Sequence, residues 1–171
     1  NRETVTKLKA SYREVLSKYQ KNPKEFSVVS QPLELQFERV DKLFSAFEVA
    51  MEQKSYQEVS KIVKALDDLI GNLKLVIEEA PSIIVLGKSV IPKKQESIVA
   101  IAKKMHQEGY NLDYLKLGYN IQEANKKITD IFQRLNVLNI EDSLLELKTM
   151  LDYFDSIYNE FDKERLSRQN Y

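Results

Sequence analysis

Hydrophobic residues recur every seven positions through roughly the first fifty residues. The members of this series are aromatic or branched aliphatic: Val5, Tyr12, Tyr19, Phe26, Leu33, Val40 and Phe47. This spacing returns side chains to one face of an α-helix. Pro23 and Pro32 fall within the series, and proline removes a backbone donor and disfavours helix at the preceding residue. The pattern therefore predicts helices over about 2–21 and 32–53, with a break or kink somewhere in 21–32.

A second helical pattern begins after a short polar turn at 53–55. Ser55, followed by Glu58 three residues later, matches the capping box that opens many helices. Apolar residues then recur at spacings of four and three: Val59, Val63, Leu66, Ile70, Leu73, Ile77 and Ala80. A sustained repeat of this kind indicates helices that pack at shallow angles. It predicts a helix over 56–80 that continues to 108.

The segment 82–91, between Pro81 and Pro92, is unusually rich in valine and isoleucine. In isolation it has the composition of a short strand. Because no partner strand is visible and both flanks are helical, a distorted helix is the favoured interpretation. The apolar excess also suggests a surface for a neighbouring repeat or a second chain, so self-association is a further expectation.

A helical hairpin is expected after Pro92, which suits a first helical position. Gly109 can adopt the left-handed conformation that ends a helix, and Tyr110 then follows where a cap places an apolar contact back onto Met105. Asn120, with Glu123 three residues later, resembles a capping box for the next helix.

Two more helices are predicted, over about 120–138 and 140–166. Their stripes again alternate steps of three and four: Ile121, Ala124, Ile128, Ile131, Leu135 and Leu138, then Leu144, Leu147, Leu151, Phe154, Tyr158 and Phe161. Short connections place consecutive helices antiparallel. The sequence thus predicts an all-α fold, an elongated antiparallel bundle like a spectrin repeat, over 1–171. We expect the 92–108 segment to bundle with the helix at 120–138 and the Val5–Tyr19 half of the first helix, with the last helix leading out.

Composition narrows the function classes. The chain has 26 basic and 26 acidic residues and a net charge of zero, so no overall charge draws it to nucleic acid. It has no cysteine, which fits a reducing compartment. It has no apolar run near the roughly 20 residues that a membrane-spanning helix needs.

Catalytic or metal chemistry is not indicated by any motif. His106 is the single histidine, so a histidine–cysteine metal site has at most one such ligand. It lies in a lysine-flanked last helical turn, where it suits capping of carbonyls or the helix dipole. The four glycines match neither a phosphate loop nor a dinucleotide fingerprint. We therefore expect no enzyme activity, no metal and no cofactor.

One charge asymmetry is a candidate binding feature. Between residues 88 and 106 there are five lysines and one glutamate, whereas residues 141–164 hold eight acidic residues and two lysines. The lysines are Lys88, Lys93, Lys94, Lys103 and Lys104. One interpretation is that the two segments pack side by side and neutralise each other. The alternative is that the lysine-rich segment receives an acidic partner peptide.

Four short motifs resemble those of a known family, and they occur in the same order along the chain. Met105–Leu115 reads MHQEGYNLDYL, Ser11–Glu14 reads SYRE, Ser55–Val59 reads SYQEV, and Ala80-Pro81 follows in the second long helix. The first resembles the EGY-x-L-x-x-L hairpin of the EzrA family of septation ring formation regulators, and the others match similar positions there. The resemblance covers nearly the whole chain. The valine and isoleucine excess at 82–91 departs from it.

The resemblance implies a non-enzymatic division protein with spectrin-like repeats. The family regulates assembly of the tubulin-like protein FtsZ, and it binds FtsZ and other division proteins at the inner face of the membrane. It also implies a parent protein with an N-terminal membrane anchor, located at the septum, of which this chain is a soluble internal segment. Two alternatives stay open: a generic coiled-coil scaffold or spacer with no FtsZ contact, and a membrane-surface module. No helix combines a cationic face with a wide apolar one, which disfavours the latter.

Overall fold

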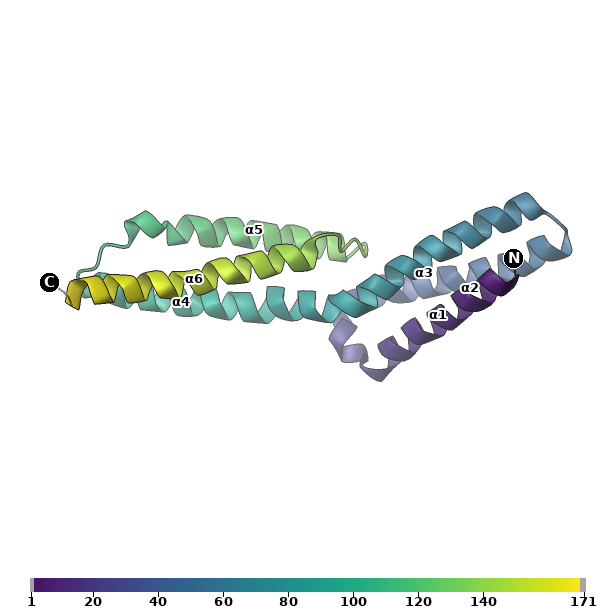
Figure 1. Cartoon of the computed structure of the whole chain (residues 1–171). Helices are drawn as coiled ribbons and strands as arrows, with labels where there is room; N and C mark the ends of the chain where they lie inside the picture. The colour runs from purple at the N-terminus through teal and green to yellow at the C-terminus, as the bar shows by residue number, and fades with distance from the viewer. Residues whose placement is uncertain (1, 170–171) are drawn as a thin grey trace. The chain divides into compact units, whose positions relative to one another are not determined.

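The computed structural model describes residues 2–169, and every regular element in that range is helical (Figure 1). The elements are α1 (Arg2–Lys21), a 3₁₀ helix (Pro23–Val29), α2 (Ser30–Glu52), α3 (Tyr56–Val85), a π-helical turn (Leu86–Val90), α4 (Ile91–Gln107), a 3₁₀ turn (Asp113–Leu115), α5 (Leu117–Leu135) and α6 (Ser143–Gln169). The predicted all-α class is confirmed.

The helices form two compact units. The first holds the described residues up to Pro81 together with Arg134–Ile140, and the second holds Ser82–Gln133 and the described residues from Glu141 onward. The expected bundle of α1, α4 and α5 is therefore wrong: α1 lies in the first unit, and α6 packs on α4 instead of leading out. The physical reason is that apolar stripes of similar width can pack against one another equally well. A stripe therefore predicts which face of a helix is buried but not which other helix covers it.

In the first unit the predicted break at 21–32 is a complete chain reversal. Tyr19, near the end of α1, donates a hydrogen bond to Glu34 near the start of α2, at 3.2 Å. Arg2, at the other end of α1, pairs with Glu48 at 3.5 Å. Helices α1 and α2 are therefore antiparallel, as the ribbon shows (Figure 1). Pro23 lies in the first turn of the connecting 3₁₀ helix, where its missing N–H costs little.

Aromatic rings fill much of the core between α1 and α2. Phe37 lies with its ring centroid 5.3 Å from that of Tyr19 and 6.1 Å from that of Tyr12. The Tyr12 hydroxyl donates to the Phe37 carbonyl oxygen at 3.0 Å, so its polar end is satisfied inside the core. Phe26, from the connecting 3₁₀ helix, packs in a tilted geometry with its ring centroid 5.6 Å from that of Tyr19, and it covers this end of the core.

The π-helical turn takes up one extra residue in the apolar stripe. Buried positions are spaced by four residues at Ile83, Gly87, Ile91 and Gln95. In a regular stripe of alternating steps of three and four residues, one of these steps would be three. The Ile91 N–H donates to the Leu86 carbonyl, a five-residue step that widens one turn. The segment 82–91 is thus helical, and only Val85 in it is an exposed large hydrophobic residue, at 53%.

Gly87 lets the ring of Phe132 on α5 approach the backbone of this turn. A Cβ built on Gly87 lies 2.4 Å from Phe132 Cε2, far inside contact distance. The Lys88 amino group lies 5.0 Å from the centroid of the same ring. A side chain at this position would require the end of the half-buried Phe132 side chain to move.

In the second unit α4 and α6 run parallel, and α5 runs antiparallel to both. Lys94 pairs with Asp155, and further along both helices Glu108 pairs with Arg165 at 3.7 Å. The core is mostly aliphatic and includes Ile98, Met105, Ile131, Leu147 and Phe154. Two polar side chains are buried with it, Gln95 and Ser143, and neither the Gln95 Nε2 nor the Ser143 Oγ has a hydrogen-bond partner among the described residues.

The helix that ends at Gly109 has the predicted cap. Gly109 has φ +94°, its N–H donates to the His106 carbonyl, and the Tyr110 N–H donates to the Met105 carbonyl. This is a Schellman motif. The same two bonds close α2 at Lys54 and α5 at Leu138, where side chains other than glycine occupy the left-handed position, with φ 57° and 59°.

The predicted capping box at Asn120 and Glu123 is wrong. Helix α5 already begins at Leu117, so Asn120 lies inside it. Its side-chain amide donates to the Leu115 carbonyl at 3.1 Å and to the Tyr153 hydroxyl at 2.6 Å. The residue joins α5 to α6, a role that no local spacing could indicate.

Candidate interaction surfaces

The five lysines singled out from the sequence do not form one cluster. Lys94 is half-buried, pairs with Asp155 and lies 5.9 Å from the centroid of Tyr158, while Lys88 lies over Phe132. Lys93, Lys103 and Lys104 are exposed on α4. The lysine-rich segment therefore splits into residues that hold the fold and residues that face solvent.

Packing of the lysine-rich segment against the acidic one is observed, since α4 and α6 lie side by side. Charge neutralisation is only partial. Lys94–Asp155 joins the two segments with the expected polarity. The Glu108–Arg165 pair lies just beyond both segments and has the opposite polarity. No ion pair forms on Lys93, Lys103 or Lys104 within residues 2–169. Three of the five cations thus remain available to another molecule.

The α4–α5 groove is a hollow of about 560 Å³ between the last turns of α4 and the start of α5. It is lined by Ala102, Lys103, His106, Leu112, Asp113, Lys116, Leu117 and Gly118. The exposed His106 side chain, for which the sequence predicts capping of carbonyls or an interaction with the helix dipole, lines this groove. Lys116 lay outside the lysine-rich segment and was missed. It reaches the groove because the hairpin folds the chain back after Gly109.

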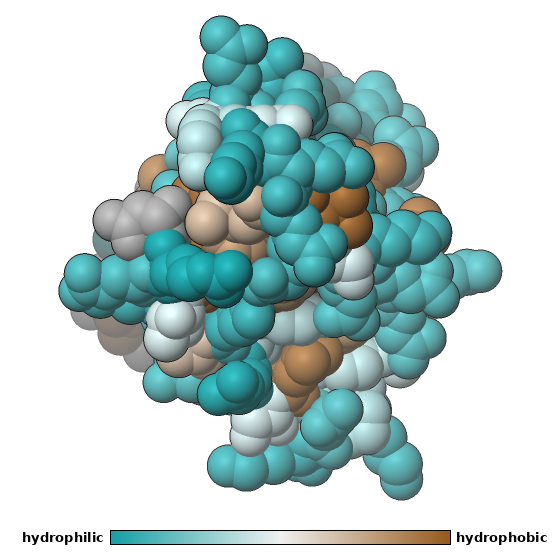
Figure 2. Space-filling view, turned by 90° about the vertical axis from the view of Figure 1, so that its right-hand side faces the viewer, coloured by the Kyte–Doolittle hydropathy of each residue, from teal (hydrophilic) through white to brown (hydrophobic). Residues whose placement is uncertain are grey.

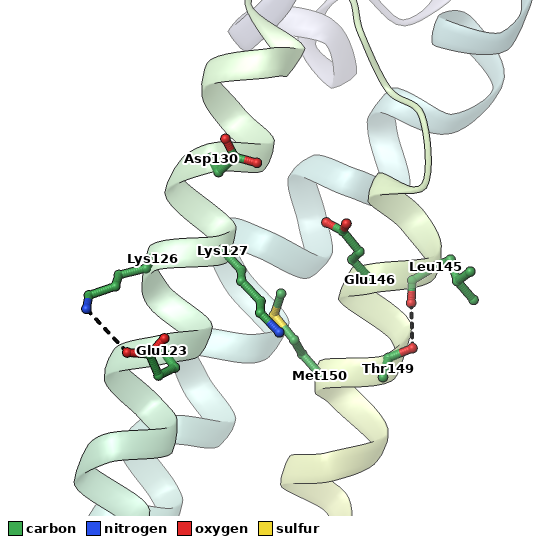
Figure 3. Close-up of a pocket in the computed structure, with 8 residues that line it drawn as sticks. All are labelled: Glu123, Lys126, Lys127, Asp130, Leu145, Glu146, Thr149 and Met150. Carbon is green, nitrogen blue, oxygen red and sulfur yellow. Dashed lines mark hydrogen bonds and ion pairs between the residues drawn. The ribbon is translucent and has the colours of Figure 1, made fainter.

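A second groove, of about 480 Å³, separates α5 from α6 (Figure 3). Helix α5 contributes Glu123, Lys126, Lys127 and Asp130, and α6 contributes Leu145, Glu146, Thr149 and Met150. Figure 3 shows Lys127 extending across it toward Met150, while Leu145 points away from α5. Its charges are mixed, and Glu123 is already paired with Lys126 at 3.3 Å. This balance indicates no ligand of one sign.

The tip of the second hairpin is held by aromatic and polar contacts from α6. The Arg168 guanidinium lies 4.2 Å from the centroid of Tyr110, and that of Arg165 lies at 5.8 Å. The Tyr114 hydroxyl donates to Glu164 at 2.7 Å, and this hydrogen bond is the main cause that raises the pKa of Tyr114 to about 12. The loop that carries Lys116 is thereby fixed against the end of α6.

One face of the molecule is largely polar. In the space-filling view hydrophilic side chains cover most of the visible face, and apolar side chains appear as separate patches (Figure 2). In the part of the chain that the structure describes, no group of three or more histidine, cysteine or carboxylate residues is placed to hold a metal ion. None of the helices described here combines the length and the apolar character required to span a bilayer.

The fold and these surfaces define an all-α helical-bundle protein whose features are helix faces and open grooves. A family model described as septation ring formation regulator, EzrA, matches residues 1–171. The chain belongs to the EzrA family.

Individual relatives agree with this assignment. The septation ring formation regulator EzrA of Staphylococcus epidermidis is 24% identical over 159 residues, which cover 93% of this chain and 28% of the relative. That of Geobacillus sp. (strain WCH70) is 25% identical over 167 residues, 98% of this chain and 30% of the relative. The chain thus spans less than a third of the length of these relatives. No solved structure matches it.

Proposed function

We propose that this chain is a rod and docking segment of a septation ring regulator that acts on FtsZ ring assembly at the inner face of the membrane. The observation that carries the proposal is the family match over residues 1–171. In this proposal the units are spectrin-like repeats, the parent protein is membrane-anchored at the septum, and no chemistry is required of the segment. Its partners are FtsZ and other division proteins, and the exposed lysines of α4 are the first candidates for contact.

The test is co-sedimentation of the 171-residue chain with GTP-assembled FtsZ, with light scattering recorded during assembly. We expect the chain to pellet with the polymers or to lower the scattering signal. A chain that stays in the supernatant and leaves scattering unchanged contradicts a direct contact. It would favour the alternative, a spacer that joins other parts of the parent protein.

A charge-reversal pair tests the lysine face within the same assay. Lys93→Glu with Lys104→Glu reverses two exposed charges that form no ion pair within the described residues, so the helical circular dichroism signal should not change. We expect pelleting to be lost. Retained pelleting with the same helical signal would remove this face from the proposal.

A further inference from the structure

The α4–α5 groove carries more positive than negative charge. Lys103, Lys116 and His106 lie on its rim with one carboxylate, Asp113. Within residues 2–169 neither Lys103 nor Lys116 forms an ion pair. The nearby carboxylates are occupied: Glu108 pairs with Arg165, and Glu164 accepts from Tyr114. An anionic group therefore meets unneutralised cations here.

The floor of the groove is apolar and has space above it. Leu112 and Leu117 are half-buried, so part of each side chain faces the groove. Gly118 presents no side chain, and a Cβ built there meets no other atom within 4 Å. The volume of about 560 Å³ accommodates one bulky side chain with flanking backbone. The groove thus combines an apolar anchor point with a cationic rim.

We propose that the α4–α5 groove binds a short acidic peptide segment of a partner protein, which places one bulky apolar side chain on Leu112 and Leu117 and carboxylates beside Lys103 and Lys116. The inference rests on the proposed docking function and adds the chemistry of the partner. Apolar anchoring with charge complementarity at the rim is the usual arrangement of a peptide site.

Other anionic molecules fit less well. Nucleic acid requires a run of phosphate contacts, whereas this groove offers few cations, an acidic rim residue and a chain of zero net charge. A bilayer surface requires a wide apolar helix face beside a cationic one. The groove has room for one anchor, not for such a face.

The first measurement uses the whole chain and fluorescein-labelled heptapeptides in a fluorescence anisotropy titration at low ionic strength, because salt screens exposed charges. The probe has six glutamates around a central phenylalanine. Two control peptides replace the phenylalanine with serine or the glutamates with lysines. We expect the probe to bind at least about tenfold more tightly than either control. Equal affinities, or no binding of the probe, would overturn the proposal.

A matched pair of variants separates binding from folding. Lys116 and Lys54 are both exposed lysines in the left-handed conformation, with φ 48° and 57°. Glycine relieves the backbone strain at either position and removes one charge. Both Lys116→Gly and Lys54→Gly should raise the midpoint of thermal unfolding. Only Lys116→Gly should weaken peptide binding, by about threefold or more.

A variant that is more stable and yet binds less tightly cannot owe its defect to unfolding. If Lys116→Gly binds as tightly as the unsubstituted chain, or if Lys54→Gly weakens binding equally, the groove is not the site. Anionic vesicles containing phosphatidylserine form a separate arm. Vesicle binding that Lys116→Gly weakens, with no peptide binding, would also overturn the proposal.

A steric pair tests the apolar anchor. Gly118→Phe introduces a bulky side chain at a residue that lines the groove, whereas Gly71→Phe adds the same side chain on α3, which does not line it. A Cβ at either position meets no other atom within 4 Å. We expect Gly118→Phe to abolish binding of the probe and Gly71→Phe to leave it unchanged. Probe binding that survives Gly118→Phe would exclude the groove.

The peptide assay and FtsZ co-sedimentation fail independently. Probe binding without co-sedimentation supports the groove and contradicts the FtsZ contact. If the probe does not bind, and co-sedimentation occurs and is unchanged by Lys116→Gly, the FtsZ contact is supported and the groove proposal is contradicted.

Discussion

The two helical units bury similar helix stripes by different means. In the first, the rings of Tyr12, Tyr19, Phe26 and Phe37 stack between α1 and α2. In the second, an aliphatic core is accompanied by polar links between helices, such as Asn120 to Tyr153 and Lys94 to Asp155. Burial of aromatic rings removes a large apolar area from water and favours tilted or edge-to-face ring pairs, whereas polar links between helices cost free energy when a partner is missing. Polar links also join α1 to α2, at Tyr19–Glu34 and Arg2–Glu48. The two units therefore differ in the side chains that fill the core, aromatic in the first and mostly aliphatic in the second, while both use polar contacts to set helix register.

The largest expected effect comes from emptying either core. Phe37→Ala in the first unit and Phe154→Ala in the second should each lower the free energy of unfolding by about 3–5 kcal/mol, because each leaves a cavity among buried side chains. Urea denaturation followed by circular dichroism measures both. A loss below about 0.5 kcal/mol at either position would mean that its ring is not part of the core.

Gly87→Ala tests a close approach of a ring to a helix backbone, which among the glycines of the second unit occurs only at Gly87. The new methyl would lie 2.4 Å from Phe132, so α5 or its ring must move. We expect a net loss of about 1 kcal/mol, because strain against the ring outweighs the gain in helix propensity. Gly71→Ala in the first unit is the control; its Cβ meets nothing within 4 Å, and it should gain roughly 0.5–1 kcal/mol from helix propensity. Equal effects of the two substitutions would contradict the close contact.

Gln95→Met should stabilise the second unit. Gln95 is 7% exposed, and its amide nitrogen has no hydrogen-bond partner among the described residues, so a thioether of similar length removes a desolvation cost. The expected gain is about 1 kcal/mol in denaturant titration. A loss of stability would show that the amide is satisfied in solution and contributes to the fold.

Tyr12→Phe tests whether Tyr12 makes the stability of the first unit depend on pH. Burial, followed by the nearby negative charge of Asp41, raises the pKa of Tyr12 from 10.0 to about 12. The folded state therefore keeps a proton that the unfolded state has lost between pH 10 and 12. The stabilisation is fully present below pH 10 and declines as pH rises toward 12.

The measurement is the midpoint of thermal unfolding at pH 9 and pH 11. Tyr12→Phe should show a smaller decrease between the two than the unsubstituted chain. At pH 9 it should cost about 0.5–1 kcal/mol, because the hydrogen bond to the Phe37 carbonyl is lost. An identical decrease in both proteins would exclude Tyr12 as a source of the alkaline sensitivity.

The helices and several of their ends could be predicted from the sequence, because these features depend on residues a few positions apart. Local sequence patterns predicted three features: the helical series from Val5 to Phe47, the break at the prolines of the first reversal, and the left-handed cap at Gly109. The spacing of four at residues 83, 87, 91 and 95 also carried the signal of the π-helical turn, although the prediction went no further than a distortion.

Only the tertiary structure decided which helices share a core and which residues meet at a surface. It brought α6 onto α4, gave Asn120 to Tyr153, and divided the lysines between internal contacts and solvent. It also placed Lys116 and Lys103 in the same groove, which no linear motif predicts. Local steric and hydrogen-bonding rules act over one or two helical turns, whereas the choice among equivalent apolar stripes depends on side-chain fit between distant segments.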